Sequence, residues 1–311
     1  MRTGGPAAPG LESLTRCSTL LRVTLAALRP APPPRGGPLV SVVIATYNWS
    51  SVLRLAIESV LDQTYESWEL IVVGDGCTDD SEQVVASFRD PRIRWLGLTQ
   101  NSGSQSAPNN AGIAAARGTY VAYLGHDDLW FPGHLARLVG TAARSGAEVV
   151  FGIGCQIGPP GSNILWLLPL GSFEPDLGVN PSTLMHMRSL VEQSGGWRDF
   201  RNLTAAPDIE FAGRIVDAAG AWARSTALTT AKFNSALRPN SYVERRCDEQ
   251  EAMLARIRSA PRRTALRLLT VYAWLKLRRA RERAPGRTPP PDAPPGWLVH
   301  EWRRVRGLPR L

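Results

Sequence analysis

Two adjacent carboxylates, Asp127 and Asp128, stand directly after an apolar run at residues 119–125. Hard divalent cations such as Mg²⁺ and Mn²⁺ prefer oxygen ligands, and they are often shared with substrate phosphates. The pair therefore suits a cation bound together with a nucleotide diphosphate. The alternative is that both carboxylates only cap the helix that we expect to begin near Pro132.

A second group of polar residues could contact the base and ribose of a nucleotide. Asp75 follows the apolar run 68–74, and Gly76 allows the backbone to turn sharply. A carboxylate in this place can accept hydrogen bonds from a uracil-like edge or from ribose hydroxyls; alternatively, it only caps the next helix. The polar turn after the run 39–45 could contact the same groups, although it is a weak signal alone; it consists of Thr46, Tyr47 and Asn48.

These residues need a scaffold that brings the ends of several apolar runs together. Short β-branched apolar runs alternate with helical patterns up to about residue 152, which is typical of βα units in a buried parallel sheet. Open sheets of this kind bind ligands beyond the carboxyl ends of their strands. The runs cover residues 39–45, 68–74, 93–98, 119–125 and 147–153.

Helical patterns lie between and after these runs. We expect Ser50 and Ser51 to cap a helix whose apolar stripe includes Leu55 and Val60. The less regular half beyond residue 153 is expected to form the acceptor side of a cleft. Further helices are predicted near residues 79–81, from 132 toward 144, over 208–219, and from 241 to about 283.

The charge of the chain is unevenly distributed. The 311 residues carry a formal net charge of +9, but residues 241–311 hold 17 Lys and Arg against 7 Asp and Glu, so the rest is nearly neutral. A basic tail with Trp274, Trp297 and Trp302 could lie on an anionic membrane surface; the alternative is a packed helix with a solvated basic face. No nucleic-acid recognition fold accompanies the tail, so we expect no nucleic-acid binding.

The cysteines and the hydropathy pattern bear on the compartment. Cys17, Cys77, Cys155 and Cys247 are scattered without ligand or disulfide spacing, which favours a reducing compartment. No run approaches the ~20 apolar residues of a membrane-spanning helix, and no clear signal peptide is present. We therefore expect a cytoplasmic protein, with contact at the inner face of the membrane if the tail binds there.

Four segments are more specific in their order and spacing than any one of them alone. They are VSVVIATYN, GDGCTDD, QNSGSQSAPNNAGIAAARGTYVAYLGHDD and PDIEFAGR, within residues 39–215. Together they resemble family 2-like glycosyltransferases of the GT-A fold. The resemblance implies an α/β fold with a Rossmann-like, mixed but mainly parallel sheet flanked by helices. The charge and helical pattern after residue 240 add a helical basic C-terminal extension.

The resemblance also assigns roles to residues. Asp208 corresponds to the catalytic base, and Asp127, with Asp128 beside it, to the metal-binding part of the DxD motif, which implies Mn²⁺ or Mg²⁺. Asp75 corresponds to the acidic residue that contacts the base. The remaining nucleotide-sugar positions implied by the resemblance are Thr46, Tyr47, Asn48, Asn101, Asn109, Asn110, Gly112 and Asp127.

The implied activity is inverting, metal-dependent transfer of a sugar from a nucleotide-diphosphate donor. The acceptor would be a saccharide, lipid-linked or other hydroxyl, as in cell-surface polysaccharide or glycoconjugate synthesis. On this basis residues 1–38, rich in Pro and Gly, are expected to be a disordered leader. Residues 39–240 would form the catalytic domain, and 241–311 a basic helical extension with a Pro-rich linker.

The chain departs from the family pattern at two positions. Gly125 stands where the family often has an Asp before the metal-binding Asp, and Pro207 stands where it has a Glu before the base. These departures favour an alternative, a catalytically inactive nucleotide-sugar-binding homologue that acts as a partner or scaffold. His126 could add a ligand to the metal site, but we expect it to point into solvent. Arg214 could hold a phosphate, but we expect it to pair with Glu210.

A dehydrogenase of the Rossmann type is excluded by the turn after the first run. The segment ATYNWSS stands there in place of the glycine fingerprint GxGxxG, and no P-loop occurs in the chain.

Overall fold

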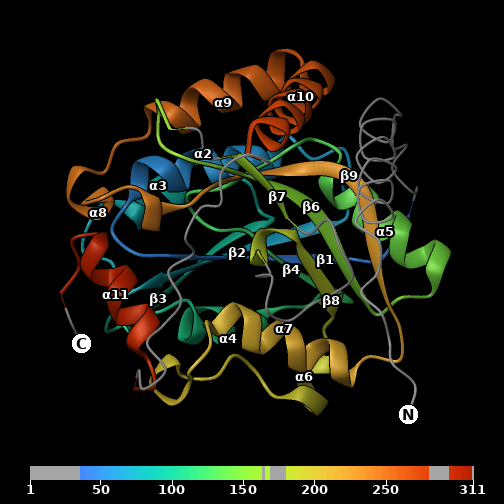
Figure 1. The fold of residues 1–311 in the computed structure, drawn as a ribbon. Helices are drawn as coiled ribbons and strands as arrows, with labels where there is room; N and C mark the ends of the chain where they lie inside the picture. The colour runs from blue at the N-terminus through green and yellow to red at the C-terminus, as the bar shows by residue number, and fades with distance from the viewer. Residues whose placement is uncertain (1–35, 163–164, 169–179, 280–293, 310–311) are drawn as a thin grey trace, which may run out of the picture.

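The protein is described by a computed structural model that covers residues 36–162, 165–168, 180–279 and 294–309, and in these residues one nine-stranded sheet is flanked by helices (Figure 1). The strands follow the order β3-β2-β1-β4-β8-β6-β9-β5, and β7 pairs with β6. Strands β5, β7 and β8 run against the others, so the predicted mixed but mainly parallel sheet is confirmed. The strands are β1 (Val40–Thr46), β2 (Trp68–Asp75), β3 (Ile93–Leu98), β4 (Tyr120–Tyr123), β5 (Leu129–Trp130), β6 (Val149–Ile157), β7 (Leu165–Leu168), β8 (Leu184–Met187) and β9 (Trp222–Phe233).

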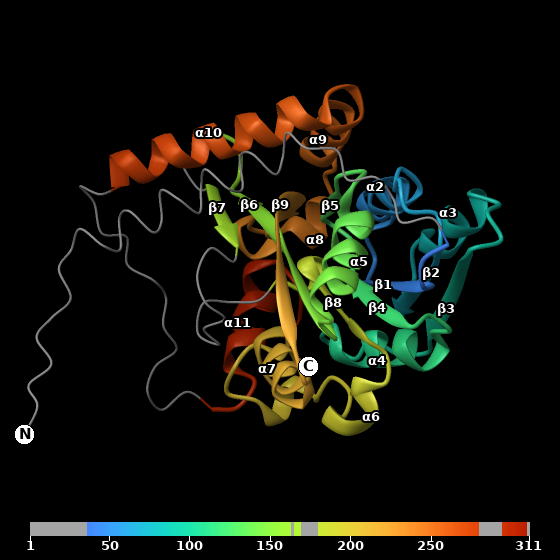
Figure 2. The same cartoon turned by 90° about the vertical axis from the view of Figure 1, so that its right-hand side faces the viewer.

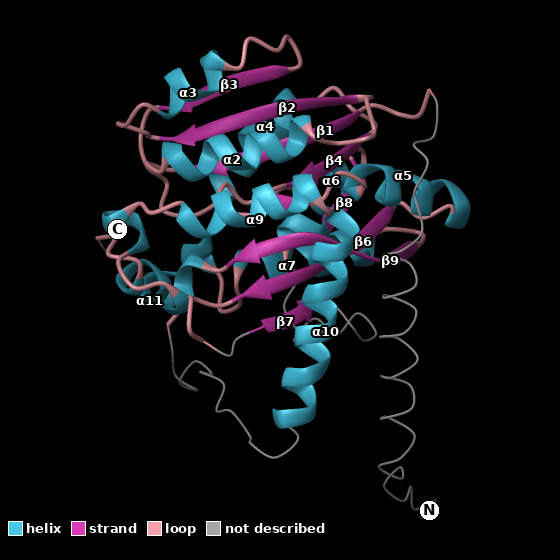
Figure 3. Ribbon diagram, turned by 90° about the horizontal axis from the view of Figure 1, so that it is seen from above, coloured by secondary structure: helices cyan, strands magenta, loops and turns pink. Residues whose placement is uncertain are grey.

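The first half of the chain builds parallel βα units. Seen from above, β3, β2, β1 and β4 occupy one side of the molecule, and β6, β9 and β7 the other (Figure 3). Successive side chains of a strand point to opposite faces, so Val42 and Val43 of β1 belong to different hydrophobic clusters. Both faces of this part of the sheet are therefore buried.

Helices cover the two faces in separate layers. One cluster joins the sheet to α2 (Ser50–Leu61) and α5 (His134–Ser145), with α3 (Ser81–Ser87) beside α2. The opposite cluster joins it to α4 (Ser106–Ala115), α6 (Leu190–Ser194) and α7 (Pro207–Ala218). In Figures 1 and 2, α2 and α3 lie above the sheet, and α4, α6 and α7 lie below it.

The helices after residue 240 pack onto the same body. They are α8 (Ser241–Glu244), α9 (Asp248–Ser259), α10 (Pro261–Arg279) and α11 (Trp297–Val305). Met253 of α9 and Leu269 of α10 share a hydrophobic cluster with Leu129 of β5 and Ile153 of β6. The division at residues 38 and 240 stays a prediction, and residues 1–35 of the expected leader, with 280–293 of the expected linker, lie outside the described residues.

All five apolar runs predicted as strands are confirmed, but the start of the first helix differs from the expectation. Helix α2 begins at Ser50 itself, and neither Ser50 nor Ser51 caps it. Instead, the Ser50 backbone N–H donates to the Asp79 carboxylate at 3.1 Å, so the cap comes from a residue 29 positions away. None of the helices in the described ranges is long and apolar enough to cross a membrane.

Candidate active site

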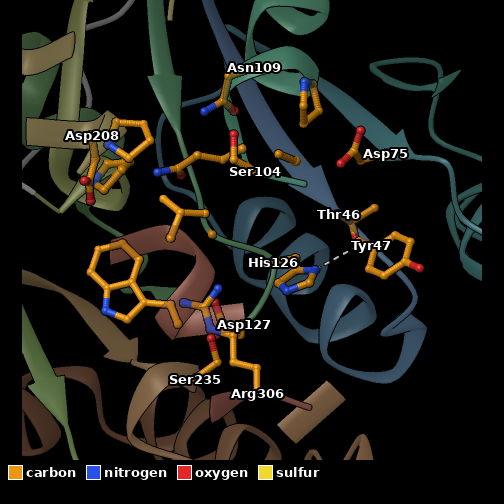
Figure 4. Close-up of a pocket in the computed structure, with 18 of the residues that line it drawn as sticks. Thr46, Tyr47, Asp75, Ser104, Asn109, His126, Asp127, Asp208, Ser235 and Arg306 are labelled. Carbon is orange, nitrogen blue, oxygen red and sulfur yellow. Dashed lines mark hydrogen bonds between the residues drawn. The ribbon is translucent and has the colours of Figure 1, made fainter. Parts of the chain in front are cut away.

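A pocket opens where β1, β2 and β4 end, at the edge of the sheet that the sequence predicts (Figure 4). Polar side chains line it because each of these strands gives way to a polar turn at the same edge. The predicted site residues that line it are Thr46, Tyr47, Asp75, Asn101, Asn109, Asp127 and Asp208. Residues more than 160 positions apart in the sequence thus converge on one cavity.

Asp75 is fixed at one end of the pocket by the loop that follows β3. Its carboxylate accepts hydrogen bonds from the Asn101 side chain and from the Ser102 backbone N–H, each at 3.0 Å. Burial raises the pKa of Asp75 above its ordinary value, and the hydrogen bonds from Ser102 oppose this. Asp75 does not cap α3, whose N-cap residue is Asp80.

Three predicted binding residues support the pocket from behind without lining it. Asn48 accepts a hydrogen bond from the Thr78 backbone N–H at 2.7 Å, which fixes the turn after β2. Asn110 bonds both the N–H and the carbonyl of Trp197, each at 2.8 Å. Gly112 lies so close to β1 that an added Cβ would stand 2.4 Å from the Val43 side chain. Their roles as direct contacts stay predictions.

The two adjacent carboxylates have different surroundings. Asp127 lines the pocket, and in the described part of the chain its carboxylate accepts no hydrogen bond. Asp128 is fully buried and accepts hydrogen bonds from the Ser182 hydroxyl at 2.5 Å and the Phe233 backbone N–H at 2.9 Å. Only Asp127 is therefore free to bind a ligand without exchanging a partner within the protein.

Lys232 of β9 places a cation among the acidic residues. Its ammonium lies 3.3 Å from the Asp128 carboxylate. Burial acts to lower the pKa of Lys232, but the negative charges of Asp128, Asp127 and Asp208 raise it above its ordinary value. The lysine therefore stays charged and partly offsets the repulsion between the carboxylates.

The expectation that His126 points into solvent is wrong. The side chain is only 5% exposed, and its two ring nitrogens lie 2.8 Å from the Thr46 hydroxyl and 3.0 Å from the Tyr242 hydroxyl. Burial lowers the pKa of His126, which favours the neutral ring. Because the histidine follows β4, it can link the turn after β1 to α8.

Asp208 occupies the first turn of α7, on the far wall of the pocket. Pro207 fits the first helical position because it has no N–H to leave unpaired there. The Asp208 carboxylate accepts a hydrogen bond from the Ile209 N–H at 3.0 Å. Burial raises the pKa of Asp208, and Lys232 opposes this. A partly buried carboxylate of raised pKa that faces a cavity is suited to proton transfer.

The expected ion pair one turn later is confirmed. Arg214 Nε lies 2.6 Å from the Glu210 carboxylate, and the guanidinium also donates to the backbone carbonyls of residues 194–196. Arg214 therefore ties α7 to the segment after α6.

Helix α11 and the residues after it form a wall of the pocket that the sequence analysis missed. Val299, Trp302, Arg303 and Arg306 line the cavity. The sequence leaves open whether this basic and aromatic segment contacts a membrane or packs as a helix, and nothing in the sequence order shows that it returns to the ends of β1 and β2. Lys232 was missed because the strand β9 was not predicted, although its run of Thr and Ala residues, with period-2 alternation in part, could have indicated it.

The fit of a divalent cation can be judged from Asp127. Within the described ranges, no group of three or more His, Cys, Asp or Glu side chains could hold a metal alone. Mg²⁺ is commonly bound by one or two carboxylates together with substrate phosphates. The unpaired Asp127 carboxylate fits this second kind of site, in which the substrate supplies further ligands.

Comparison with known proteins agrees with the geometry. The sequence model described as Glycosyl transferase family 2 matches residues 41–178. The succinoglycan biosynthesis protein ExoO of Rhizobium meliloti is 40% identical over 112 residues, 36% of this chain and 32% of that protein. WfgD of Escherichia coli, named a UDP-Glc:alpha-D-GlcNAc-diphosphoundecaprenol beta-1,3-glucosyltransferase, is 32% identical over 114 residues, 37% of this chain and 45% of that protein. The chain spans about a third of the length of the curated relatives it matches.

Solved structures show the same fold. S. aureus TarS 1–349 in complex with UDP-GlcNAc aligns with a TM-score of 0.53 and 20% identity, over 63% of this chain and 58% of that one. The mannosyltransferase PcManGT of Pyrobaculum calidifontis, in complex with GDP-Man and Mn²⁺, aligns with a TM-score of 0.50 and 17% identity. The alignment covers 89% of this chain and 86% of that one. The described strands adopt the GT-A fold, and residues 41–178, which include the strands that end at the pocket, match the model of glycosyl transferase family 2.

Proposed function

We propose that this protein is an inverting, metal-dependent glycosyltransferase that moves a sugar from a nucleotide-diphosphate donor to a hydroxyl of a saccharide or lipid-linked acceptor. The observation that carries the proposal is the convergence of Asp75, Asp127 and Asp208 on one pocket. The names of ExoO and WfgD point to synthesis of cell-surface polysaccharide. The scattered cysteines favour action in the cytoplasm.

Asp208 is the proposed general base. It would take the proton of the acceptor hydroxyl while the acceptor oxygen bonds to the anomeric carbon and the bond to the diphosphate breaks on the opposite side. Its raised pKa brings its basicity closer to neutral pH than that of an ordinary carboxylate. The hydrogen bond from Ile209 and the start of α7 fix the carboxylate in place.

Asp75 and the first loop are proposed to hold the nucleotide. The Asp75 carboxylate is already oriented by Asn101 and Ser102, so it does not have to be ordered when the nucleotide binds. Thr46, held by His126, forms the adjacent wall.

Asp127 is the proposed anchor of Mn²⁺ or Mg²⁺, which when bound would neutralise charge on the departing diphosphate. Asp128 could serve as a second ligand only by giving up one of its bonds to Ser182, Lys232 or Phe233. We therefore expect its larger contribution to be the orientation of the turn that carries Asp127.

The test is release of nucleotide diphosphate from UDP-, GDP- and dTDP-sugars with Mn²⁺ or Mg²⁺. The wild type is compared with Asp127→Ala and Asp208→Asn, and with Arg304→Gln as a control, because the Arg304 side chain on α11 is 62% exposed. Metal-dependent release that both site substitutions abolish and the control retains would support the transferase. Tight nucleotide binding without turnover would instead favour the inactive homologue.

A further inference from the structure

The wall formed by α11 lies outside the region that matches the family. The match ends at residue 178, whereas Trp302, Arg303 and Arg306 line the pocket from the other end of the chain. Two backbone hydrogen bonds, Asn240 N–H to Val305 carbonyl at 3.0 Å and Tyr242 N–H to Arg306 carbonyl at 3.3 Å, fix this wall to α8. The end of α11 is therefore held in a definite position beside the site.

The two arginines of this wall, Arg303 and Arg306, differ in the hydrogen bonds that their guanidinium groups make. Arg303 is 4% exposed, and its guanidinium donates to the Gly103 carbonyl at 2.9 Å and the Pro309 carbonyl at 3.0 Å. Arg303 thus joins α11 to the loop that holds Asp75. Arg306, in contrast, makes no side-chain hydrogen bond or ion pair with any described residue, and its Nε is buried without an acceptor.

An unpaired guanidinium donor is costly because a buried polar group loses its hydrogen bonds to water. A group that faces a cavity can recover them from a ligand. Guanidinium matches phosphate oxygens with parallel N–H donors, and such charge-assisted pairs are stronger than neutral ones. The unpaired donor of Arg306 therefore indicates an anionic ligand in this part of the pocket.

Arg306 lines the same cavity as Asp127 and Asp208, the residues of the proposed chemistry. Its positive charge acts on Asp208 and on Tyr242, the residue that bonds His126 beside Asp127. The phosphates of a bound donor must lie between the nucleotide at Asp75 and the reacting sugar near Asp208. Arg306 and Asp127 both line this part of the molecule (Figure 4).

We propose that Arg306 binds the diphosphate of the nucleotide-sugar donor, so that the C-terminal wall completes a donor site in which Asp75 and Asp127 lie within the matched residues 41–178. The inference rests on the proposed function. Arg306 would supply a fixed positive charge to the departing diphosphate, in addition to any bound cation. Arg303 is a positioning residue that holds the wall against the loop after β3.

The test measures equilibrium binding of UDP, GDP and dTDP, and of the matching nucleosides, to the full chain by calorimetry. For the nucleoside diphosphate that binds the wild type best, Arg306→Gln should weaken binding about tenfold to a hundredfold. Affinity for the nucleoside should stay unchanged, because the nucleoside has no phosphate. Arg306→Lys, which keeps the charge without the paired donors, should recover part of the loss.

Arg304→Gln is the matched control. Its side chain is 62% exposed and pairs with Glu301 on the outer face of the same helix, so binding should not change. Thermal melting without ligand shows that each variant is folded. Equal diphosphate affinity in wild type and Arg306→Gln would overturn the inference and leave the transferase standing. Failure of the wild type to bind any of the nucleotides would overturn both.

Discussion

The ammonium of Lys232 lies 3.3 Å from the carboxylate of Asp128, one residue from the proposed metal ligand. Asp128 is fully buried, and Lys232 forms an ion pair with it. The pair links the turn after β4 to the end of β9. It therefore fixes the turn that carries Asp127.

Replacing Lys232 with Met should destabilise the protein. The substitution leaves the buried Asp128 carboxylate without its counter-charge, so the free energy of unfolding should fall by about 3 kcal/mol, as measured by urea denaturation. The double variant Lys232→Met with Asp128→Asn should regain part of this loss, because it no longer buries an unpaired charge. If the single and double variants are equally stable, the charges of Lys232 and Asp128 do not stabilise each other.

Asp208→Asn should separate activity from stability. Loss of a general base lowers turnover by about 10²–10⁴-fold, measured as donor-dependent product formation. Because the pKa of Asp208 is raised in the folded state, its ionised form disfavours folding at neutral pH. The variant should thus be at least as stable as the wild type at pH 7. A variant that is both inactive and unstable would contradict this assignment.

The rate of transfer should follow the ionisation of Asp208. As pH falls through its raised pKa, the carboxylate gains a proton and can no longer act as a base, so the turnover rate should fall at a pH above the usual carboxyl range. Over the same interval, protonation of Asp208 contributes stability, which is lost again as pH rises. A pH–rate profile that stays flat down to pH 4 would argue against Asp208 as the base.

Removal of divalent cations with EDTA should stop turnover, and Mn²⁺ or Mg²⁺ should restore it. Binding of Mn²⁺ in the presence of the nucleoside diphosphate can be followed by electron paramagnetic resonance, independently of activity. Asp127→Asn should weaken this binding by at least about tenfold. Full turnover in EDTA would rule out the metal and leave charge neutralisation to the protein's own cations.

Gly125→Ala should be destabilising. An added Cβ at Gly125 would stand 2.9 Å from Asp128 Oδ2 and 3.3 Å from Asp127 Oδ1, both closer than normal packing allows. The expected loss is about 1–3 kcal/mol, measured by thermal and urea unfolding. Gly213→Ala, where an added Cβ meets nothing within 4 Å, should be neutral or stabilising. If the free energy of unfolding of Gly125→Ala equals that of the wild type, the turn accommodates the added Cβ without cost.

The first half of the fold was predictable from the sequence because β1, β2 and β4 are largely buried and their residues form apolar runs. Strands β5, β7, β8 and β9 were not predicted, since β5, β7 and β8 are four residues long or shorter and β9 mixes Arg, Ser, Thr and Lys with apolar residues. Asp75 and Asp127 could be predicted as site residues because each follows the end of an apolar run. Lys232 and Arg306 could not be found in that way, because their place depends on tertiary contacts between distant segments.

Predictions based on neighbouring residues also failed where a residue far away in the sequence caps a helix or buries a side chain. Asp79 caps α2 in place of Ser50 and Ser51, which are already inside the helix. His126 lies in a turn, as expected, but it is buried because Tyr242, 116 positions later, bonds its ring. In both cases the deciding contact is one that periodicity and capping patterns cannot show.

The bond from Arg303 to the Gly103 carbonyl has a consequence for protein engineering. A chimera that exchanges residues 41–178 for the corresponding region of a relative would keep α11 but replace the loop on which it docks. Its pocket would then combine the strand ends and loops of the relative with the α11 wall of this protein. Donor preference in this protein should therefore transfer only when the loop around Gly103 and the segment 297–308 are exchanged together.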